Sequence, residues 1–251
     1  MVEYFGPSGM TAIEKRVHRS LFSRHERIAL DWFVQRLPPY VTPDLLTAFG
    51  LFGAFVSLCG YALCVLSHQF LWLASAGLVM HWFGDSLDGS LARFRGIERP
   101  RYGFFLDQNI DVVGNFLIVG GMAVSPYIRL EPAVLALFGY QALTIYVLVR
   151  LNLDRVFHVT VLHSGPTEMR ALIILMNMLI LVFGAPVWTL FGISFAWCDI
   201  TIGLFGFGML SAFAFLVWFD ASQLRREDNQ ALLDPSVVDR ARSPRDEAEA
   251  A

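Results

Sequence analysis

Four aspartates in the middle of the chain are the residues whose types and spacing could do chemistry. Asp85 and Asp88 are three residues apart and Asp107 and Asp111 are four apart, so each pair would share one face of a helix. No lysine or arginine lies inside the apolar stretches that hold them. Four carboxylates within apolar stretches need cations to stay ionised, and two divalent ions would balance their four charges. Oxygen ligands in this number favour Mg²⁺, Mn²⁺ or Ca²⁺ over zinc. We therefore expect a site with two divalent ions, Mg²⁺ or Mn²⁺. For any single aspartate, a helix cap or an ion pair is the alternative explanation.

The composition indicates what kind of elements position these residues. Of the 251 residues, 55% are hydrophobic and 16% are charged, and the mean hydropathy is +0.53. Soluble domains contain roughly 45–50% apolar and about 25% charged residues. The sequence therefore indicates a polytopic membrane protein. The three cysteines, Cys59, Cys64 and Cys198, form no CxxC pair, so we expect neither a disulfide framework nor a zinc site.

Six apolar stretches are long enough to cross the roughly 30 Å hydrocarbon core of a bilayer as helices. They lie at about residues 45–66, 70–92, 103–124, 132–149, 171–186 and 200–219. The fifth is short, and its helix could begin near Pro166, because proline is tolerated in a first helical turn. The predicted fold class is all-α, a polytopic membrane protein with six transmembrane helices.

Basic residues predict how this protein is oriented. All but one of the 19 lie in the N-terminal segment, the second and fourth loops and the C-terminal tail, and the exception is Arg129. Because lysine and arginine stay on the cytoplasmic side, both termini are expected in the cytoplasm, with the chain in the cell's inner (cytoplasmic) membrane. With a rise of about 1.5 Å per residue, both aspartate pairs then fall near the cytoplasmic surface at similar depth.

The two ends of the chain differ from its centre. Residues 1–41 are expected to be a cytoplasmic segment with an amphipathic interfacial helix over about residues 10–37, in which apolar residues such as Ile28 and Trp32 recur at helical spacing. A basic anchor with no further role is the alternative. Residues 42–219 would form the membrane domain, and the polar tail 220–251 is expected to be largely disordered.

The aspartates belong to a longer motif. It reads Asp85-x2-Asp88-Gly89-x2-Ala92-Arg93, then nine residues, then Gly103-x3-Asp107-x3-Asp111. This spacing resembles the signature of the CDP-alcohol phosphotransferase (CDP-alcohol phosphatidyltransferase) family. The resemblance extends to Thr42, Pro43 and Thr47 at the start of the first span. Asp44 departs from the family pattern, because asparagine is usual at this position. Whether the start of the first span contacts the nucleotide is therefore left open.

The resemblance implies a phospholipid-synthesising membrane enzyme that moves a phosphoalcohol from a CDP-linked donor to a hydroxyl and releases CMP. It implies that Asp85, Asp88 and Asp107 hold the two ions on the donor diphosphate. Asp111 would complete the metal site and act as the general base. The implied nucleotide-binding residues are Asp88, Gly89, Ala92, Arg93 and Gly103. Helix packing is the alternative explanation for the glycines. Family members are homodimers, so a homodimer is expected, and no nucleic-acid partner is.

The resemblance leaves open which substrate is the lipid. The Thr167-Glu168 segment resembles the opening of a late membrane helix in choline and ethanolamine phosphotransferases, which favours slightly a CDP-aminoalcohol donor and a diacylglycerol-like acceptor. The alternative is a CDP-diacylglycerol-dependent enzyme with inositol phosphate or glycerol phosphate as acceptor, for which Arg150, Arg155 and Arg170 are candidate ligands. An ion-coupled carrier is an alternative of another class. Carriers place such sites near the midplane, often in an inverted repeat, and the sequence has neither feature.

Overall fold

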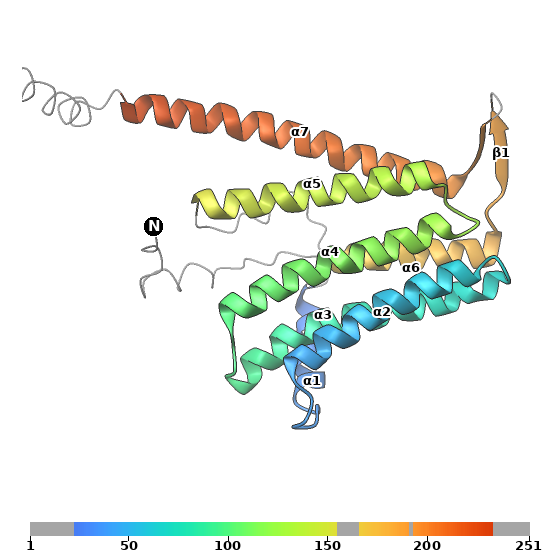
Figure 1. Ribbon diagram of the computed structural model, residues 1–251, viewed down its shortest axis with the longest axis horizontal. Helices are drawn as coiled ribbons and strands as arrows, with labels where there is room; N and C mark the ends of the chain where they lie inside the picture. Colours follow the sequence, from blue (N-terminus) through green and yellow to red (C-terminus); the bar gives the residue numbers. More distant parts are fainter. Residues whose placement is uncertain (1–22, 155–165, 191–192, 233–251) are drawn as a thin grey trace, which may run out of the picture.

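The computed structural model describes residues 23–154, 166–190 and 193–232, which form seven α-helices and one short hairpin (Figure 1). The helices are α1 (Ser23–Val34), α2 (Pro43–Leu63), α3 (Leu71–Arg95), α4 (Pro100–Val124), α5 (Leu130–Asp154), α6 (Pro166–Phe183) and α7 (Trp197–Leu232). A 3₁₀ turn, η2 (His68–Phe70), precedes α3, and strands β1 (Val187–Leu190) and β2 (Ile193–Ala196) pair antiparallel between α6 and α7.

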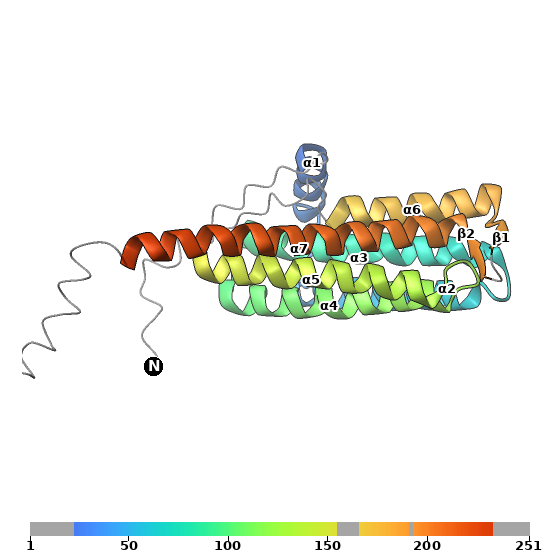
Figure 2. The same ribbon diagram turned by 90° about the horizontal axis from the view of Figure 1, so that it is seen from above.

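The long helices α2 to α7 lie side by side along one axis and form a single bundle, whereas α1 lies across it (Figures 1 and 2). The hairpin caps one end of the bundle, and α7 extends beyond the other helices at the opposite end (Figure 1). Among the described residues, three helical segments are long and apolar enough to cross a membrane: Pro43–Leu63, Leu130–Leu153 and Trp197–Gln230. Helices α3, α4 and α6 are not among these three segments. Six membrane crossings therefore remain a prediction.

Three features differ from the sequence-based expectations. First, α7 continues past Asp220 to Leu232, so the first part of the predicted disordered tail is helical, and residues 233–251 lie outside the described residues. Second, α6 ends at Phe183, directly before Gly184, whose φ is +71°, and a short hairpin that the sequence analysis did not predict follows within an otherwise all-helical fold. Its strands are rich in β-branched and aromatic residues, which suit extended backbone.

The third difference concerns the N-terminal helix. Of the predicted stretch, residues 23–37 lie within the described part of the chain, and Ser23–Val34 are helical. Val34 is buried against Leu87 and Leu91 of α3, whereas Ile28 and Trp32 are exposed. The apolar face that the sequence predicts at the membrane surface is therefore exposed, and a second apolar face, which was not predicted, packs on the bundle.

Helices α2 and α3 pack so closely that their backbones touch. A Cβ atom added at Gly84 would lie 2.5 Å from the backbone nitrogen of Gly50 and 2.5 Å from the carbonyl oxygen of Leu46. A Cβ at Gly77 would lie 2.4 Å from the backbone nitrogen of Ser57. Glycine is therefore required along this seam, and the seam fixes the height of the α3 aspartates relative to the start of α2.

A buried polar contact fixes α6 against the same pair of helices. Tyr61 of α2 donates a hydrogen bond to the side-chain oxygen of Asn177 at 3.0 Å, and the Asn177 amide donates to Ser75 of α3 at 3.1 Å. All three side chains are buried. Because unpaired polar groups are costly in a core, these bonds specify one position of α6 along α2 and α3.

Candidate active site

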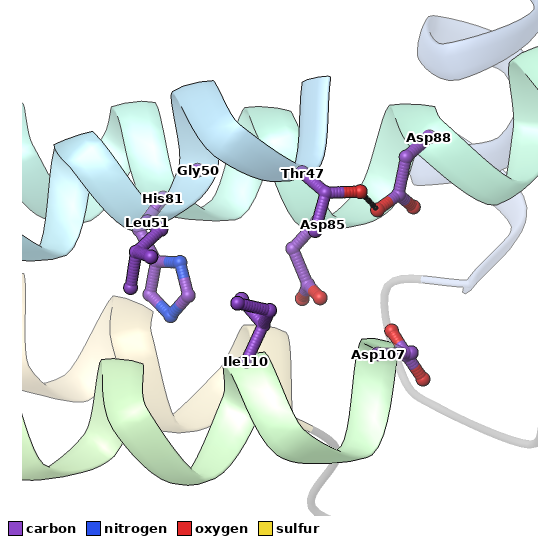
Figure 3. A pocket seen from close by; sticks show the side chains of 8 residues that line it. All are labelled: Thr47, Gly50, Leu51, His81, Asp85, Asp88, Asp107 and Ile110. Atoms are coloured by element: carbon purple, nitrogen blue, oxygen red, sulfur yellow. Dashed lines mark hydrogen bonds between the residues drawn. The ribbon is translucent and has the colours of Figure 1, made fainter. Parts of the chain in front are cut away.

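Three of the four predicted aspartates come together between α3 and α4. Asp85 projects from α3 toward α4, which carries Asp107 (Figure 3). Asp111 lies one turn after Asp107 on the same helix. One carboxylate oxygen from each of the three lies within 4.8 Å of the others. All three side chains are half-buried. This arrangement offers several hard oxygen ligands around one point, as Mg²⁺ and Mn²⁺ require.

The fourth aspartate, Asp88, turns toward α2 instead. Its Oδ2 accepts a hydrogen bond from the Thr47 hydroxyl at 2.7 Å, and its Oδ1 accepts one from the Gly89 amide at 2.6 Å. The eight residues around this small pocket, drawn in Figure 3, are Thr47, Gly50, Leu51, His81, Asp85, Asp88, Asp107 and Ile110. Asp88 therefore shares the pocket with the cluster, but a neighbouring helix orients its carboxylate.

A cation lies within the acidic cluster, contrary to the expectation that none is available from the apolar stretches. Nη1 of Arg170 donates a hydrogen bond to Oδ2 of Asp85 at 2.7 Å, and its Nη2 lies 3.8 Å from Oδ1 of Asp111. The Arg170 side chain is only 10% exposed. Arg170 lies inside the helix because α6 begins at Pro166, the alternative start that the sequence analysis allowed, rather than at Ala171.

His81 completes the inner side of the site and was missed by the sequence analysis. It lies one turn before Asp85 on α3, is 1% exposed, and its Nε2 is 3.4 Å from Nη2 of Arg170. Gly114 of α4 makes room for the ring, because a Cβ there would lie 2.9 Å from Nε2. The available signal was its spacing: a histidine four residues before Asp85 shares its helical face.

The motif glycines face open space. A Cβ at Gly103 would meet no atom within 4 Å, and one at Gly89 would meet only the flexible guanidinium of Arg93, at 3.3 Å. Arg93 itself is exposed and donates to Ser90 Oγ at 3.2 Å, while Ala92 is half-buried. Helix packing within the chain, the alternative explanation for these two glycines, therefore does not account for them.

Two of the remaining residues singled out from the sequence, Arg150 and Asp44, form ion pairs outside the cluster. Arg150 forms an ion pair with Asp220 of α7, at 3.2 Å between Nε and Oδ2, and Arg155 lies outside the described residues. Asp44, the departure from the family pattern, accepts a hydrogen bond from Arg99, which ties the start of α2 to the α3–α4 connection. This bond raises the pKa of Arg99 above its ordinary value.

Similarity to known proteins agrees with this geometry. The family model described as CDP-alcohol phosphatidyltransferase matches residues 40–221, which include α2 to α6 and all four aspartates. A protein of Cutibacterium acnes (strain DSM 16379 / KPA171202) named phosphatidylinositol phosphate synthase is 35% identical over 88 residues. That alignment covers 35% of this chain and 40% of the relative, so it spans less than half the length of either. On the family match over most of its length, the chain belongs to the CDP-alcohol phosphatidyltransferase family.

Proposed function

We propose that this enzyme transfers a phosphatidyl group from CDP-diacylglycerol to a hydroxyl of a soluble phosphorylated alcohol, with inositol phosphate as the first candidate. Family membership supports transfer from a CDP-linked donor. The name of the similar protein describes a phosphatidyl group joined to an inositol phosphate. These findings favour the second of the two donor readings over a CDP-aminoalcohol donor, for which the Thr167-Glu168 segment was the main argument.

The observation that carries the proposal is the buried guanidinium of Arg170 beside Asp85 and Asp111. A phosphorylated acceptor brings negative charge next to carboxylates and needs a cation there. Arginine binds phosphate through two parallel hydrogen bonds, so Arg170 suits this role. An uncharged diacylglycerol acceptor would bring no phosphate for this guanidinium to bind.

The acidic cluster fits a divalent metal. Asp85, Asp107 and Asp111 supply oxygen ligands from two helices, within 4.8 Å of one another. A divalent ion held there would neutralise charge on the donor diphosphate and on the departing CMP. A second ion remains a prediction, because Asp88, which would share in holding it, is hydrogen-bonded to Thr47.

The chain's own residues then have distinct tasks. Asp111, whose side chain is 32% exposed, would accept the proton of the acceptor hydroxyl as its oxygen attacks the phosphorus that bears the diacylglycerol. A new O–P bond forms, the bond to CMP breaks, and the proton remains on the Asp111 carboxylate. Thr47 would hold Asp88 in place on the donor side, next to the open surface at Gly89 and Gly103.

A substrate panel on the purified protein in detergent or nanodiscs tests the proposal. CMP release is expected from CDP-diacylglycerol with inositol phosphate or glycerol phosphate. It should stop when EDTA is added and return with Mg²⁺ or Mn²⁺. CMP release from CDP-choline or CDP-ethanolamine with diacylglycerol would contradict the proposed donor. Absence of CMP from every pair would contradict the proposed reaction.

A further inference from the structure

Arg170 forms a hydrogen bond inside an acidic cluster whose ligands suit a metal ion. Two of the three clustered carboxylates, those of Asp85 and Asp111, lie against one guanidinium, that of Arg170. The shortest contact, 2.7 Å between Nη1 of Arg170 and Oδ2 of Asp85, is the length of a charge-assisted hydrogen bond. Arg170 therefore neutralises part of the same charge that a divalent metal held by these aspartates would neutralise.

Arg170 is held firmly in this position. It lies seven residues before Asn177, so both residues share the face of α6 that looks toward α3. Asn177 is fixed by its bonds to Tyr61 and Ser75, and His81 packs beside the guanidinium. A side chain that is 10% exposed has little room to leave the cluster unless the charges around it change.

We propose that Arg170 is a resident counter-cation, which holds the aspartates together without metal and competes with the divalent ion for Asp85. A metal ion bound to Asp85 and Asp111 would stand next to the guanidinium, and the two cations would repel each other. Metal binding thereby weakens the bond between Arg170 and Asp85 and frees the guanidinium for the acceptor phosphate. The inference rests on the metal-binding part of the proposed function.

A different role for Arg170 would change the metal affinity in the opposite direction. If Arg170 only positioned Asp85 as a metal ligand, its removal would weaken metal binding. If it competes, its removal strengthens metal binding and destabilises the metal-free protein, because the carboxylates then repel one another without compensation. The direction of the change in metal affinity therefore separates the two roles.

The test measures Mn²⁺ binding to the full-length protein without substrates, by calorimetry or by electron paramagnetic resonance. For Arg170→Gln we expect a Kd about tenfold lower than that of the wild type, equivalent to about 1.4 kcal/mol. The metal-free Tm should fall, and the rise in Tm on adding Mn²⁺ should exceed that of the wild type. Arg129→Gln is the control, since it also removes an arginine ion pair, with Glu131, from a connection at the other end of the bundle. Its Mn²⁺ affinity should match the wild type.

A second variant keeps the test decisive if Arg170→Gln does not fold without metal. Arg170→Lys retains the charge but not the two-pronged contact, so its Kd should lie between those of wild type and Arg170→Gln. With Mn²⁺ saturating, inositol phosphate should bind about tenfold more weakly to Arg170→Gln than to wild type. Unchanged or weaker Mn²⁺ binding in both variants would overturn the inference.

The two proposals can fail separately. A wild type that binds Mn²⁺ and shows the expected change in the variants, but releases no CMP from CDP-diacylglycerol, contradicts the proposed substrates alone. A wild type with the proposed activity, whose variants bind Mn²⁺ no more tightly, contradicts the counter-cation alone. A wild type without Mn²⁺ binding contradicts both.

Discussion

The contact between α2 and α3 predicts that a single methyl group at Gly84 will disable the enzyme. A Cβ there would lie 2.5 Å from the backbone nitrogen of Gly50 and 2.5 Å from the carbonyl oxygen of Leu46, whereas ordinary contacts begin at about 3.4 Å. Both neighbours are backbone atoms, which cannot rotate away. Gly84→Ala must therefore separate the helices locally by about 0.9 Å.

That displacement acts directly on the site, because Gly84 precedes Asp85 in the chain. If α3 moves by this amount away from α2, the 2.7 Å bond between Thr47 and Asp88 lengthens to about 3.6 Å, beyond hydrogen-bonding distance. Misplacement of catalytic groups by about 1 Å can lower turnover about 100-fold. Overpacking of this kind costs roughly 1–3 kcal/mol of stability.

The assay is CMP release from CDP-diacylglycerol with inositol phosphate, with Tm measured on the same preparations. Gly84→Ala should lower kcat by about 100-fold and lower Tm by several degrees. The matched control is Gly120→Ala on α4, where the added Cβ meets no atom within 4 Å. Its Tm should be unchanged or higher, since alanine favours a helix by up to about 1 kcal/mol over glycine. A Gly84→Ala enzyme with wild-type kcat and Tm would refute the argument from helix contact.

Two further substitutions test individual roles. Asp111→Asn should lower kcat by a factor of about 10²–10⁴, because it removes the proton acceptor, while Mn²⁺ binding measured by calorimetry persists through the remaining oxygens. Near-normal turnover would show that Asp111 is not the base. Thr47→Val should lower kcat/KM for CDP-diacylglycerol by about tenfold, since Asp88 loses a hydrogen bond to a charged group, with little change in Tm. Thr47→Ser keeps the hydroxyl and should retain activity, and equal losses in both variants would show that the hydroxyl is not what matters.

Much of the frame could be predicted because it depends on local pattern. All six apolar stretches lie in or overlap helices α2 to α7, since long apolar runs favour helices in a membrane. The spacing of Asp107 and Asp111 predicted that they share one face of a helix, and the similar depth of the two aspartate pairs predicted that Asp85 lies near them. Six crossings, the cytoplasmic orientation and the homodimer remain predictions, because each depends on a membrane or a second chain.

What could not be predicted depends on which helices touch. The partner of Asp88 is Thr47, 41 residues earlier, and the partner of Asp85 is Arg170, 85 residues later. Hydropathy alone favoured a start for α6 at Ala171, after the arginine, because a charged residue is unfavourable in an apolar helix, although the short span also allowed the start at Pro166 that the structure has. The tertiary ion pair with Asp85 compensates that cost, and no local pattern contains it.

The distribution of partners around the aspartates suggests how one small cluster can serve two substrates. On the side of α2, Asp88 is bound to a neutral hydroxyl and adjoins the open surface at Gly89. On the side of α6, Asp85 is bound to a buried cation. The negative charge of the donor diphosphate would be neutralised by a metal ion, so the donor needs only neutral contacts and space from the protein. A phosphorylated acceptor needs a positively charged side chain. We therefore expect the donor to enter along α2 and α3 and the acceptor along α6. Substitution of Arg170 should then change acceptor binding and metal binding together and leave donor binding the least affected.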